Sequence, residues 1–435
     1  MAVGGFDNIV STSVKTVYPQ QEIAPQINAE TPFRRALKKE LPSGARYTDG
    51  GVVNFGMNLA PPQNYGVIAD LAAMKAPVER SDKLLTLKPA LFHGTFQIGW
   101  VTKRAAVTKV AAFNKGELRR RTEETLEDLA KGIERTYLGT HGTMRLGTVS
   151  ADGSNTLTMA KPEWTTLVRE NMMVTLRQTD GGTVRDSLDN RKITKVDHDT
   201  GIITYDGADQ TATAADHLHL TVGASQGTLS AADAGGICPN GLRGLIDDGT
   251  NLATVHNVDR TAAGNHKLKA LVKSAGGVTR NLTERILINA CHEVRQRSGK
   301  RVTDIWCNTG QIEKYIDFVA PDRRFPAQGG KLPAYRTGYT EDSLVHVAPG
   351  IEMKINIGWD VIPREMYLLN WDTFFHYISQ DVDWWDEGNM LKPVPTDGGY
   401  KAGFFAALAS IENIGCTMFI ANLVIRDLKD PLVAD

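Results

Sequence analysis

The stretch NKGELRRRTEETLEDLAKGIERTYLG, residues 114–139, repeats its apolar side chains at the period of an α-helix. Asn114 and Glu117 match a capping box at its start, and Gly139 is a typical helix end. At about 36 Å long, and apolar on one face only, this helix is predicted to lie across neighbouring elements. Its apolar stripe consists of Leu118, Leu126, Leu129, Ile133 and Tyr137.

The other face of this helix is charged, and three pairs of opposite charge on it stand one turn apart. The run Arg119, Arg120 and Arg121 suits a phosphate or the acidic patch of a partner. A solvated face with internal ion pairs explains the run equally well, and both interpretations stay open. The pairs are Arg119 with Glu123, Arg120 with Glu124 and Glu127 with Lys131, and Asp128 and Arg135 complete the face.

Two extended segments, residues 84–88 and 92–102, precede the helix and are rich in β-branched and aromatic residues. Phe96, Ile98 and Trp100 stand at every second position, which is typical of a strand with one apolar face. Together with a strand predicted at 52–59, they make residues 46–110 a long excursion out and back. Because a lone hairpin is marginal in water, we expect this excursion to lie on something else.

Composition excludes several classes of protein. The chain has 435 residues and a formal net charge of −1, so no overall field attracts nucleic acid or a membrane. No apolar run reaches the roughly 18 residues of a membrane helix, and residues 1–7 do not resemble a signal peptide. The four cysteines form no C-x-x-C pair, which predicts reduced thiols rather than a disulfide framework or a metal knuckle.

The first half of the chain contains further predicted elements. Residues 1–30 are polar and are expected to order only against a partner. Thr31 and Pro32 begin a short helix over 31–37. From residue 163 the pattern becomes all-β, which predicts a small barrel or sandwich inserted into the main fold, with Gly201 in a hairpin turn. The strands expected there are 172–176, 192–196, 202–205 and 217–222.

The second half alternates helix, strand and helix, which is typical of an α+β domain. A helix over 282–298 is predicted to have Asn281 and Glu284 as a capping box and Gly299 as its end. A strand at 302–307 and a helix at 311–319 follow, and then a long loop at 322–350. The closing strands are expected at 351–357, 366–369 and 417–425.

Two clusters are candidates for chemistry. His217 and His219 share one side of a predicted strand, but no third metal ligand stands at an informative spacing, so a polar strand face is favoured. An acidic and aromatic cluster lacks the spacing of a calcium loop, so a solvated or subunit-facing loop is favoured. Its members are Asp381, Asp383, Trp384, Trp385, Asp386 and Glu387.

The sequence contains no Walker-type loop. We therefore predict no catalytic, cofactor-binding or metal-binding residues, and we expect that the protein is not an enzyme.

The order of these parts resembles that of tailed-phage major capsid proteins with the Hong Kong 97-like fold. The segments that carry the resemblance, besides residues 114–139, are TPFRRAL at 31–37, LLTLK at 84–88, FHGTFQI at 92–98, VTDIWCN at 302–308 and CTMFIANLV at 416–424. The resemblance implies an α+β fold with an N-arm, an E-loop, a spine helix, a P-domain and an A-domain, together with a small inserted β-domain.

The resemblance also implies domain boundaries. Residues 1–45 would be the N-arm and 46–110 the E-loop. The P-domain would comprise 111–162 and 351–435, with the spine helix at 114–139 and with some A-domain elements in its C-terminal part. The inserted β-domain would be 163–225, and the linker and A-domain 226–350. Phe92, Phe96, Trp100, Arg119, Arg120 and Arg121 would lie at assembly interfaces.

The function that this resemblance implies is assembly. Copies of the chain would form hexamers and pentamers that close an icosahedral shell around double-stranded DNA, in a virion assembled in the cytoplasm of a bacterial host. Its other partners would be a scaffolding protein, a portal and minor or decoration proteins, with weak, non-specific DNA contact and no membrane. Because the chain has no long charged helical prefix, we expect a separate scaffolding protein rather than a cleaved propeptide.

Two other readings stay open, and one residue of the long helix is singled out. An encapsulin-like compartment would use the same fold to hold a cargo enzyme, and a decoration or tail protein would use the β segment. Gly132 interrupts the long helix, where glycine costs about 1 kcal/mol relative to alanine. It is either a bend point between precursor and expanded shells or a place of close approach between helix and sheet.

Overall fold

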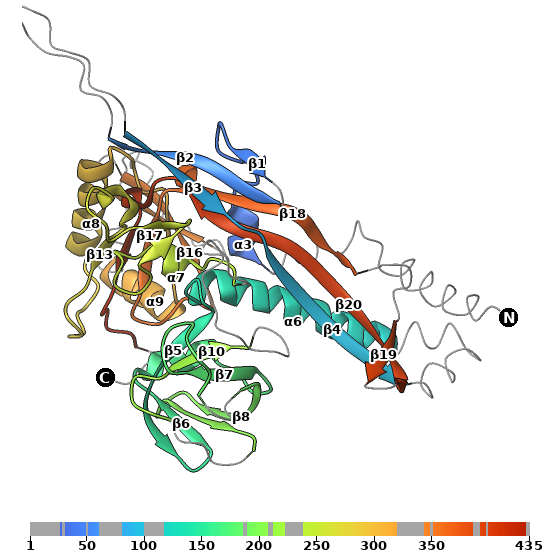
Figure 1. Ribbon diagram of the computed structural model, residues 1–435. Helices are drawn as coiled ribbons and strands as arrows, with labels where there is room; N and C mark the ends of the chain where they lie inside the picture. Colours follow the sequence, from blue (N-terminus) through green and yellow to red (C-terminus); the bar gives the residue numbers. More distant parts are fainter. Residues whose placement is uncertain are drawn as a thin grey trace, which may run out of the picture.

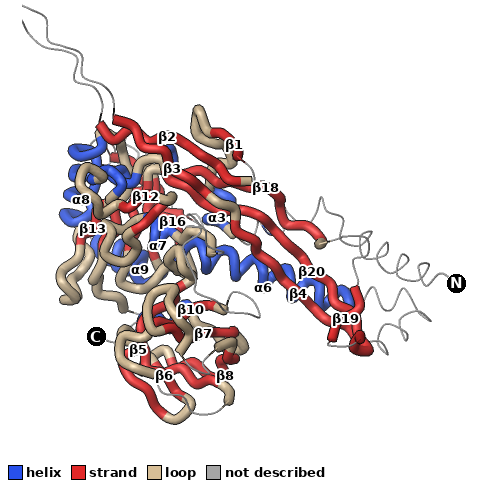
Figure 2. The backbone as a smooth tube through the Cα atoms, in the orientation of Figure 1, coloured by secondary structure: helices blue, strands red, loops and turns tan. Residues whose placement is uncertain are grey.

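The computed structural model describes residues 27, 31–48, 51–60, 81–99, 117–185, 189–207, 212–221, 238–319, 343–348, 351–385, 392–396 and 399–431. Helix α6 and the long strands β4 and β20 extend side by side away from a six-stranded sheet, and a small barrel lies below the end of α6 that meets this sheet (Figure 1). Figure 2 shows that strands make up most of the extended part and most of the barrel. The chain therefore folds as an α+β protein with an elongated layout.

Helix α6, Glu117–Gly139, confirms the long helix that the apolar period predicts. Leu126, Leu129, Ile133 and Tyr137 are all buried, and the side chain of Leu118 lies outside the described residues. Arg120 pairs with Glu124 at 3.7 Å, and Lys131 pairs with Glu127, as the spacing predicts. Asn114 lies outside the described residues.

Helix α6 packs on strand β4, Ala90–Gly99, at a position without a side chain. A Cβ atom added at Gly94 would lie 3.0 Å from Cγ2 of Thr125 and 3.5 Å from Cβ of Leu129. At Gly132 an added Cβ would meet nothing within 4 Å. The close approach of helix and sheet therefore occurs at Gly94, and close packing does not explain Gly132.

The long sheet beside α6 is built around strand β20, Gly399–Cys416. Strand β18, Phe374–Trp384, and strand β4 both pair with β20 antiparallel, and β19, Lys392–Thr396, pairs near its start. This places residues 90–99 in the body of the subunit, so the predicted excursion over 46–110 is too long. The reason is the ten-residue ladder from Ala90↔Glu412 to Gly99↔Gly403.

The six-stranded sheet is mixed and has the order β13-β21-β17-β14-β16-β15. Helices α8, Glu284–Ser298, and α9, Thr309–Val319, pack on one face of it. The other face carries Trp306, Tyr367 and Val424 into the core shared with α6. Its strands are β13 Leu271–Lys273, β14 Asp304–Cys307, β15 Ser343–Ala348, β16 Ile351–Ile357, β17 Met366–Leu369 and β21 Leu423–Ile425.

This sheet crosses the domain boundary predicted at residue 350. Strand β14 pairs with β16 on one side and with β17 on the other, so elements expected in two domains share one ladder. The boundary is predicted wrongly because the sequence of a single strand does not show which distant strand it pairs with. Helix α8 also differs in detail: its N-cap is Thr283, whose side chain accepts from the backbone N–H of Ile286, rather than Asn281, while Gly299 ends it as predicted.

The inserted β-domain is a closed barrel of order β10-β5-β6-β9-β8-β7. Because β5 and β6 belong to it, the barrel begins at Arg145 and not at residue 163. The turn before Ile202 holds Gly201 at φ +74°, as the hairpin prediction requires. The strands are β5 Arg145–Gly153, β6 Thr156–Met159, β7 Met173–Arg177, β8 Arg191–Asp197, β9 Ile202–Tyr205 and β10 His217–Leu220.

A three-stranded sheet of β1, Arg46–Thr48, β2, Val52–Ala60, and β3, Ser81–Leu87, forms the remaining excursion. One face of it is buried in the subunit's own core, through Phe55, Leu85 and others. The hairpin is thus anchored more firmly than predicted, although Leu84 is 67 % exposed. Shorter elements among the described residues include α3 Pro32–Ala36, α7 Leu242–Leu245, β11 Thr254–Val255 and β12 Val258–Asp259.

We predict opposite effects of alanine at the two glycines of this helix–strand pair. Gly132→Ala should stabilise the subunit by about 0.5–1 kcal/mol, because the site is helical and has room. Gly94→Ala should destabilise it by about 1 kcal/mol or more, because its Cβ would press on Thr125. Urea unfolding of the two variants checks this, and a loss of stability for Gly132→Ala would contradict it.

Candidate functional site

The described residues contain no group of three or more His, Cys, Asp or Glu side chains placed to hold a metal ion. Nor does any helix in the described part of the chain have the length and apolar character needed to cross a membrane. The polar groups that stand out are instead buried ones that join elements distant in sequence.

His217 and His219 lie on one side of β10, with ring centroids 6.3 Å apart. His219 is fully buried, so the predicted polar strand face is only half correct. One nitrogen, Nδ1, is 2.9 Å from the carbonyl oxygen of Thr143, and Nε2 is 3.8 Å from a carboxylate oxygen of Asp180. Burial lowers the pKa of His219 to about 4, so the ring is neutral at pH 7.

The acidic and aromatic cluster does not form the predicted loop. Asp381 and Trp384 belong to strand β18, because this strand continues its pairing with β20 as far as Leu408. Trp384 is 4 % exposed, whereas Trp385, just after the strand, is 41 % exposed. Asp386 and Glu387 lie outside the described residues.

Arg34 forms the centre of a buried polar junction. It lies in α3, Pro32–Ala36, and is 1 % exposed. Its Nε donates to Glu412 of β20 at 3.0 Å, and its Nη2 donates to Glu412 and to Asp381 of β18, each at 2.7 Å. Tyr137 of α6 donates its hydroxyl to Glu412 at 3.1 Å. One carboxylate thus joins the N-terminal segment, the long helix and the long sheet.

The charges of this junction compensate one another. Burial raises the pKa of Glu412, but His376, whose Nε2 is 3.4 Å from the carboxylate, and the Arg34 guanidinium outweigh it and lower that pKa to about 2. Because this value lies below the ordinary 4.5, the stability that ionised Glu412 contributes is present above pH 4.5. It is lost as the pH falls through about 2.

A second buried carboxylate, Glu134 of α6, holds the start of α3. It accepts from the backbone N–H of Phe33 at 2.9 Å and of Arg34 at 3.4 Å. Thr31, the predicted cap, instead donates its hydroxyl to the carbonyl oxygen of Ile27. Pro32 occupies the first helical turn, as predicted.

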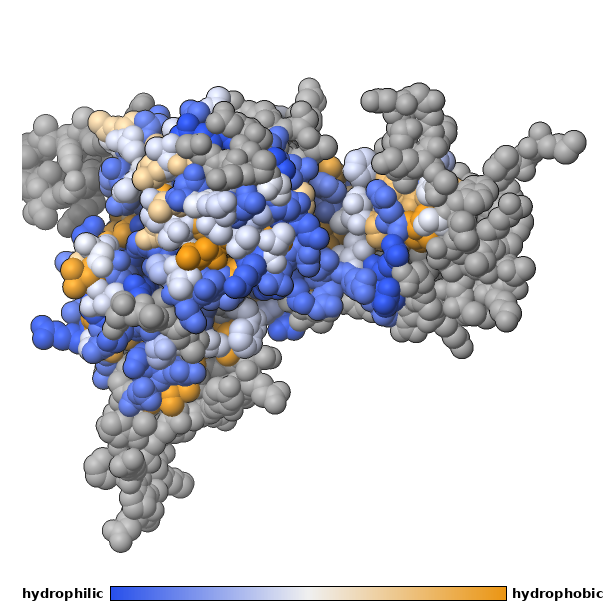
Figure 3. Space-filling model, turned by 90° about the horizontal axis from the view of Figure 1, so that it is seen from below, coloured by the Kyte–Doolittle hydropathy of each residue, from blue (hydrophilic) through white to orange (hydrophobic). Residues whose placement is uncertain are grey.

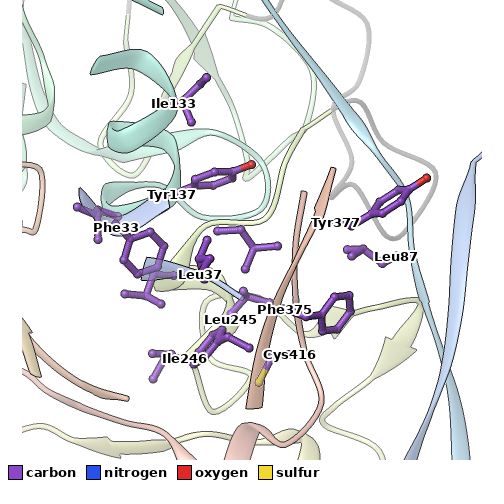
Figure 4. Close-up of a cluster of buried hydrophobic side chains, with 14 of the residues drawn as sticks. Phe33, Leu37, Leu87, Ile133, Tyr137, Leu245, Ile246, Phe375, Tyr377 and Cys416 are labelled. Atoms are coloured by element: carbon purple, nitrogen blue, oxygen red, sulfur yellow. The ribbon is translucent and has the colours of Figure 1, made fainter. Parts of the chain in front are cut away.

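Aromatic packing surrounds the same segment. The Phe33 ring meets Trp306 edge-on at 5.2 Å and Trp371 at 5.5 Å, and it is fully buried. Figure 4 shows Phe33 and Leu37 of the N-terminal segment beside Tyr137 of α6 and Leu245 of α7. Residues 31–37 are therefore part of the subunit's own core.

The residues predicted at assembly interfaces differ in where the structure places them. Phe96 is 7 % exposed and packs near Trp384, and Phe92 meets Tyr137 at 5.7 Å, so both face the subunit's own core because alternate residues of β4 face α6. Trp100 and the side chain of Arg119 lie outside the described residues. Arg120 pairs with Glu124, and Arg121 donates to the carbonyl oxygen of Gln97.

Figure 3 shows scattered apolar residues among hydrophilic ones on the face seen from below. The large exposed apolar residues are Tyr47, Leu84, Leu91, Met173, Val278, Trp359 and Trp385.

The barrel is joined to the body through the loop after β16. Ile362 of this loop is buried in the barrel core. Asp360 lies 3.4 Å from Nε of Arg135 and 3.4 Å from Nη2 of Arg169. Arg135, predicted on the solvated face of the helix, is therefore buried, because the barrel and this loop cover the last turns of α6.

Arg34, Glu134 and Glu412 do not appear among the residues that the sequence patterns select. A weak signal exists, since Glu412 is a lone charge in the run FFAALASIENIG, residues 404–415. A charge isolated in an apolar strand requires a buried partner. The sequence alone does not identify that partner, which lies 378 positions away.

We predict that Arg34→Met destabilises the subunit by about 3–5 kcal/mol, because it leaves Glu412 and Asp381 without their shared cation. Lys38→Met is the matched control. Its ion pair with Asp372 is exposed, so the loss should be about 1 kcal/mol or less. Urea unfolding measures both, and similar losses for the two variants would contradict the role of the junction.

No known family model matches the chain, and no curated protein matches its sequence. A chain of the cyanophage A-1(L) capsid asymmetric unit matches its structure with a TM-score of 0.51 and 12 % identity, over 92 % of this chain and 93 % of that one. The capsid of the native GTA particle gives 0.42, with 8 % identity over 92 % and 91 % of the two chains. The capsid of Myoviridae phage XM1 gives 0.42, with 9 % identity over 91 % of each.

The match to the cyanophage chain extends over almost the whole of both chains. At 12 % identity, this match is evidence of a shared fold and of nothing beyond it. The projecting hairpin and the long helix α6 follow each other in the order that the sequence predicts, whereas the long sheet around β20 is not predicted. This chain therefore has the Hong Kong 97-like fold, which it shares with a chain of a phage capsid.

Proposed function

We propose that the chain is the major capsid protein of a tailed bacteriophage. Copies of it would form hexamers and pentamers, and these would close an icosahedral shell around double-stranded DNA. The observation that carries this proposal is the fold shared with the cyanophage A-1(L) capsid chain over 92 % of the present chain. A non-catalytic role in the virion follows from the same proposal.

The hairpin β2–β3 supports assembly on physical grounds. The half of β3 nearest Leu87 is buried, whereas Ser81 to Leu84 are exposed. An apolar side chain such as Leu84, 67 % exposed on a projecting strand, gains from contact with a second copy. We infer that this hairpin is the E-loop and that it lies on a neighbouring subunit in the shell.

We infer the domains as follows, with boundaries adjusted to the sheets. The P-domain would comprise α6 with β4, β18, β19 and β20, and the A-domain the six-stranded sheet with α8 and α9. The barrel would be the inserted domain. A scaffolding protein, a portal and minor or decoration proteins would be partners, and contact with DNA would be weak because the net charge is −1.

We also infer that Gly132 is a bend point of α6 during shell expansion. Alanine has room there, and Gly132 is absent from the glycines at positive φ, so neither packing nor backbone conformation explains it. A helix tolerates bending more readily at glycine. If Gly132→Ala particles expand normally, this inference is wrong.

We predict that the overexpressed protein forms closed polyhedra, tubes or capsomers in negative-stain electron microscopy. Leu84→Ser should reduce their number without changing the stability of the subunit by more than about 0.5 kcal/mol, because Leu84 is exposed. Lys83→Ser, at the adjacent exposed position, is the control and should assemble normally.

Dispersed monomers of the wild type under all conditions would contradict the proposal. Particle size and nucleic-acid content separate a DNA-filled capsid from a compartment that holds protein cargo. Particles filled with protein and free of DNA, isolated from the natural source, would contradict the capsid role and leave the shell role intact.

A further inference from the structure

Glu134 is a buried acid that forms no ion pair with a cation among the described residues. It is 6 % exposed, and its two hydrogen bonds come from the backbone N–H groups of Phe33 and Arg34. The Arg34 guanidinium, the nearest candidate cation in α3, is instead hydrogen-bonded to Glu412 and Asp381. An ionised carboxylate in such a place is costly, because backbone dipoles replace only part of the lost hydration.

The charged groups around Glu134 come from every element packed on it. Arg34 of α3 favours ionisation, and Asp360 of the loop after β16 opposes it. Arg135 and Arg169 both pair with Asp360. Tyr137, one turn further along α6, directs its hydroxyl to Glu412 of β20, where His376 and Asp381 of β18 complete the surroundings. The site therefore disfavours ionised Glu134, even though two N–H groups point at it.

We propose that Glu134 is a pH-sensitive switch between α6 and the N-terminal segment 31–37, which it holds firmly when protonated and less firmly when ionised. The contact joins positions 101 residues apart, and it holds this segment on the body of the subunit together with the Arg34 ion pairs and the buried Phe33 ring. The inference stands independently of the proposed function.

The sign follows from proton linkage. Burial raises the pKa of Glu134 from 4.5 to about 7, against the two N–H groups, which lower it. When the segment opens, Glu134 becomes hydrated and its pKa returns toward 4.5. The closed form therefore binds the proton more tightly, and opening becomes easier as the pH rises from 4.5 to 7. The whole shift corresponds to a change of about 300-fold in the opening equilibrium.

The rest of the subunit should respond in the opposite direction. Burial lowers the pKa of His256 to about 3 and that of His219 to about 4. Because these rings are neutral in the fold and become charged when they unfold in acid, global stability rises with pH up to about 6.5. If the amides of one segment lose protection against hydrogen exchange over this pH range, global unfolding cannot be the cause, and the segment must open locally.

Hydrogen exchange of the full chain, read by mass spectrometry at residue level, tests the switch. After correction for intrinsic exchange rates, the Phe33 and Arg34 amides should lose protection between pH 5.5 and pH 8, by a factor of about 30. The amides of α8 serve as the internal reference and should not lose protection. In Glu134→Gln, which has no titrating group, the protection of residues 33 and 34 should be the same at both pH values.

Glu127→Gln is the matched control, because Glu127 is exposed on the same helix, and it should keep the wild-type pH response. If the wild-type amides keep or gain protection in parallel with α8, the proposal is wrong. It is also wrong if Glu134→Gln responds to pH as the wild type does. Should Glu134→Gln fail to fold, the wild-type comparison of segment 31–37 with α8 decides alone.

Discussion

The buried ion pair between Arg34 and Glu412 is the interaction on which the rest of the structure depends. Glu412 lies near the C-terminal end of the long strand β20 and is fully buried, so an unpaired carboxylate there would be costly. Arg34 reaches it from the N-terminal segment, and Tyr137 reaches it from the long helix. Three segments that are distant in the sequence must therefore be in place before all of their polar groups are satisfied, which makes the junction specific as well as stabilising.

From this junction the elongated part of the subunit follows. The antiparallel ladder between β4 and β20 runs away from Glu412, and α6 runs beside it because Gly94 lets the helix approach closely. The six-stranded sheet is buried on both faces, by α8 and α9 on one side and by the core of the junction on the other. The long helix and sheet are thus rigidly attached at one end, which suits the proposed role of a shell subunit.

Periodic patterns predict much of this fold. The apolar stripe of α6, the hairpin turn at Gly201 and the strands of the barrel after residue 163 all appear as expected. Strands β18 and β20 are not among the predicted elements. In β20, the many glycine, alanine, serine and asparagine residues make the sequence unlike that of a typical strand. The junction escapes prediction for another reason: Glu412 stands out as a lone charge in an apolar run, but Arg34 looks like an ordinary surface charge, and only the tertiary fold brings the two together. Phe92 and Phe96 show the converse error, because an alternating strand looks the same whether its apolar face meets its own core or a partner.

A double-mutant cycle on Arg34→Met and Glu412→Gln, followed by urea unfolding of the unassembled subunit, tests the central claim most directly. If the two side chains stabilise the subunit through each other, the double variant should be more stable than the sum of the single losses predicts, by about 2 kcal/mol or more. Losses that add within about 0.5 kcal/mol would mean that the two side chains act independently, and would contradict the account.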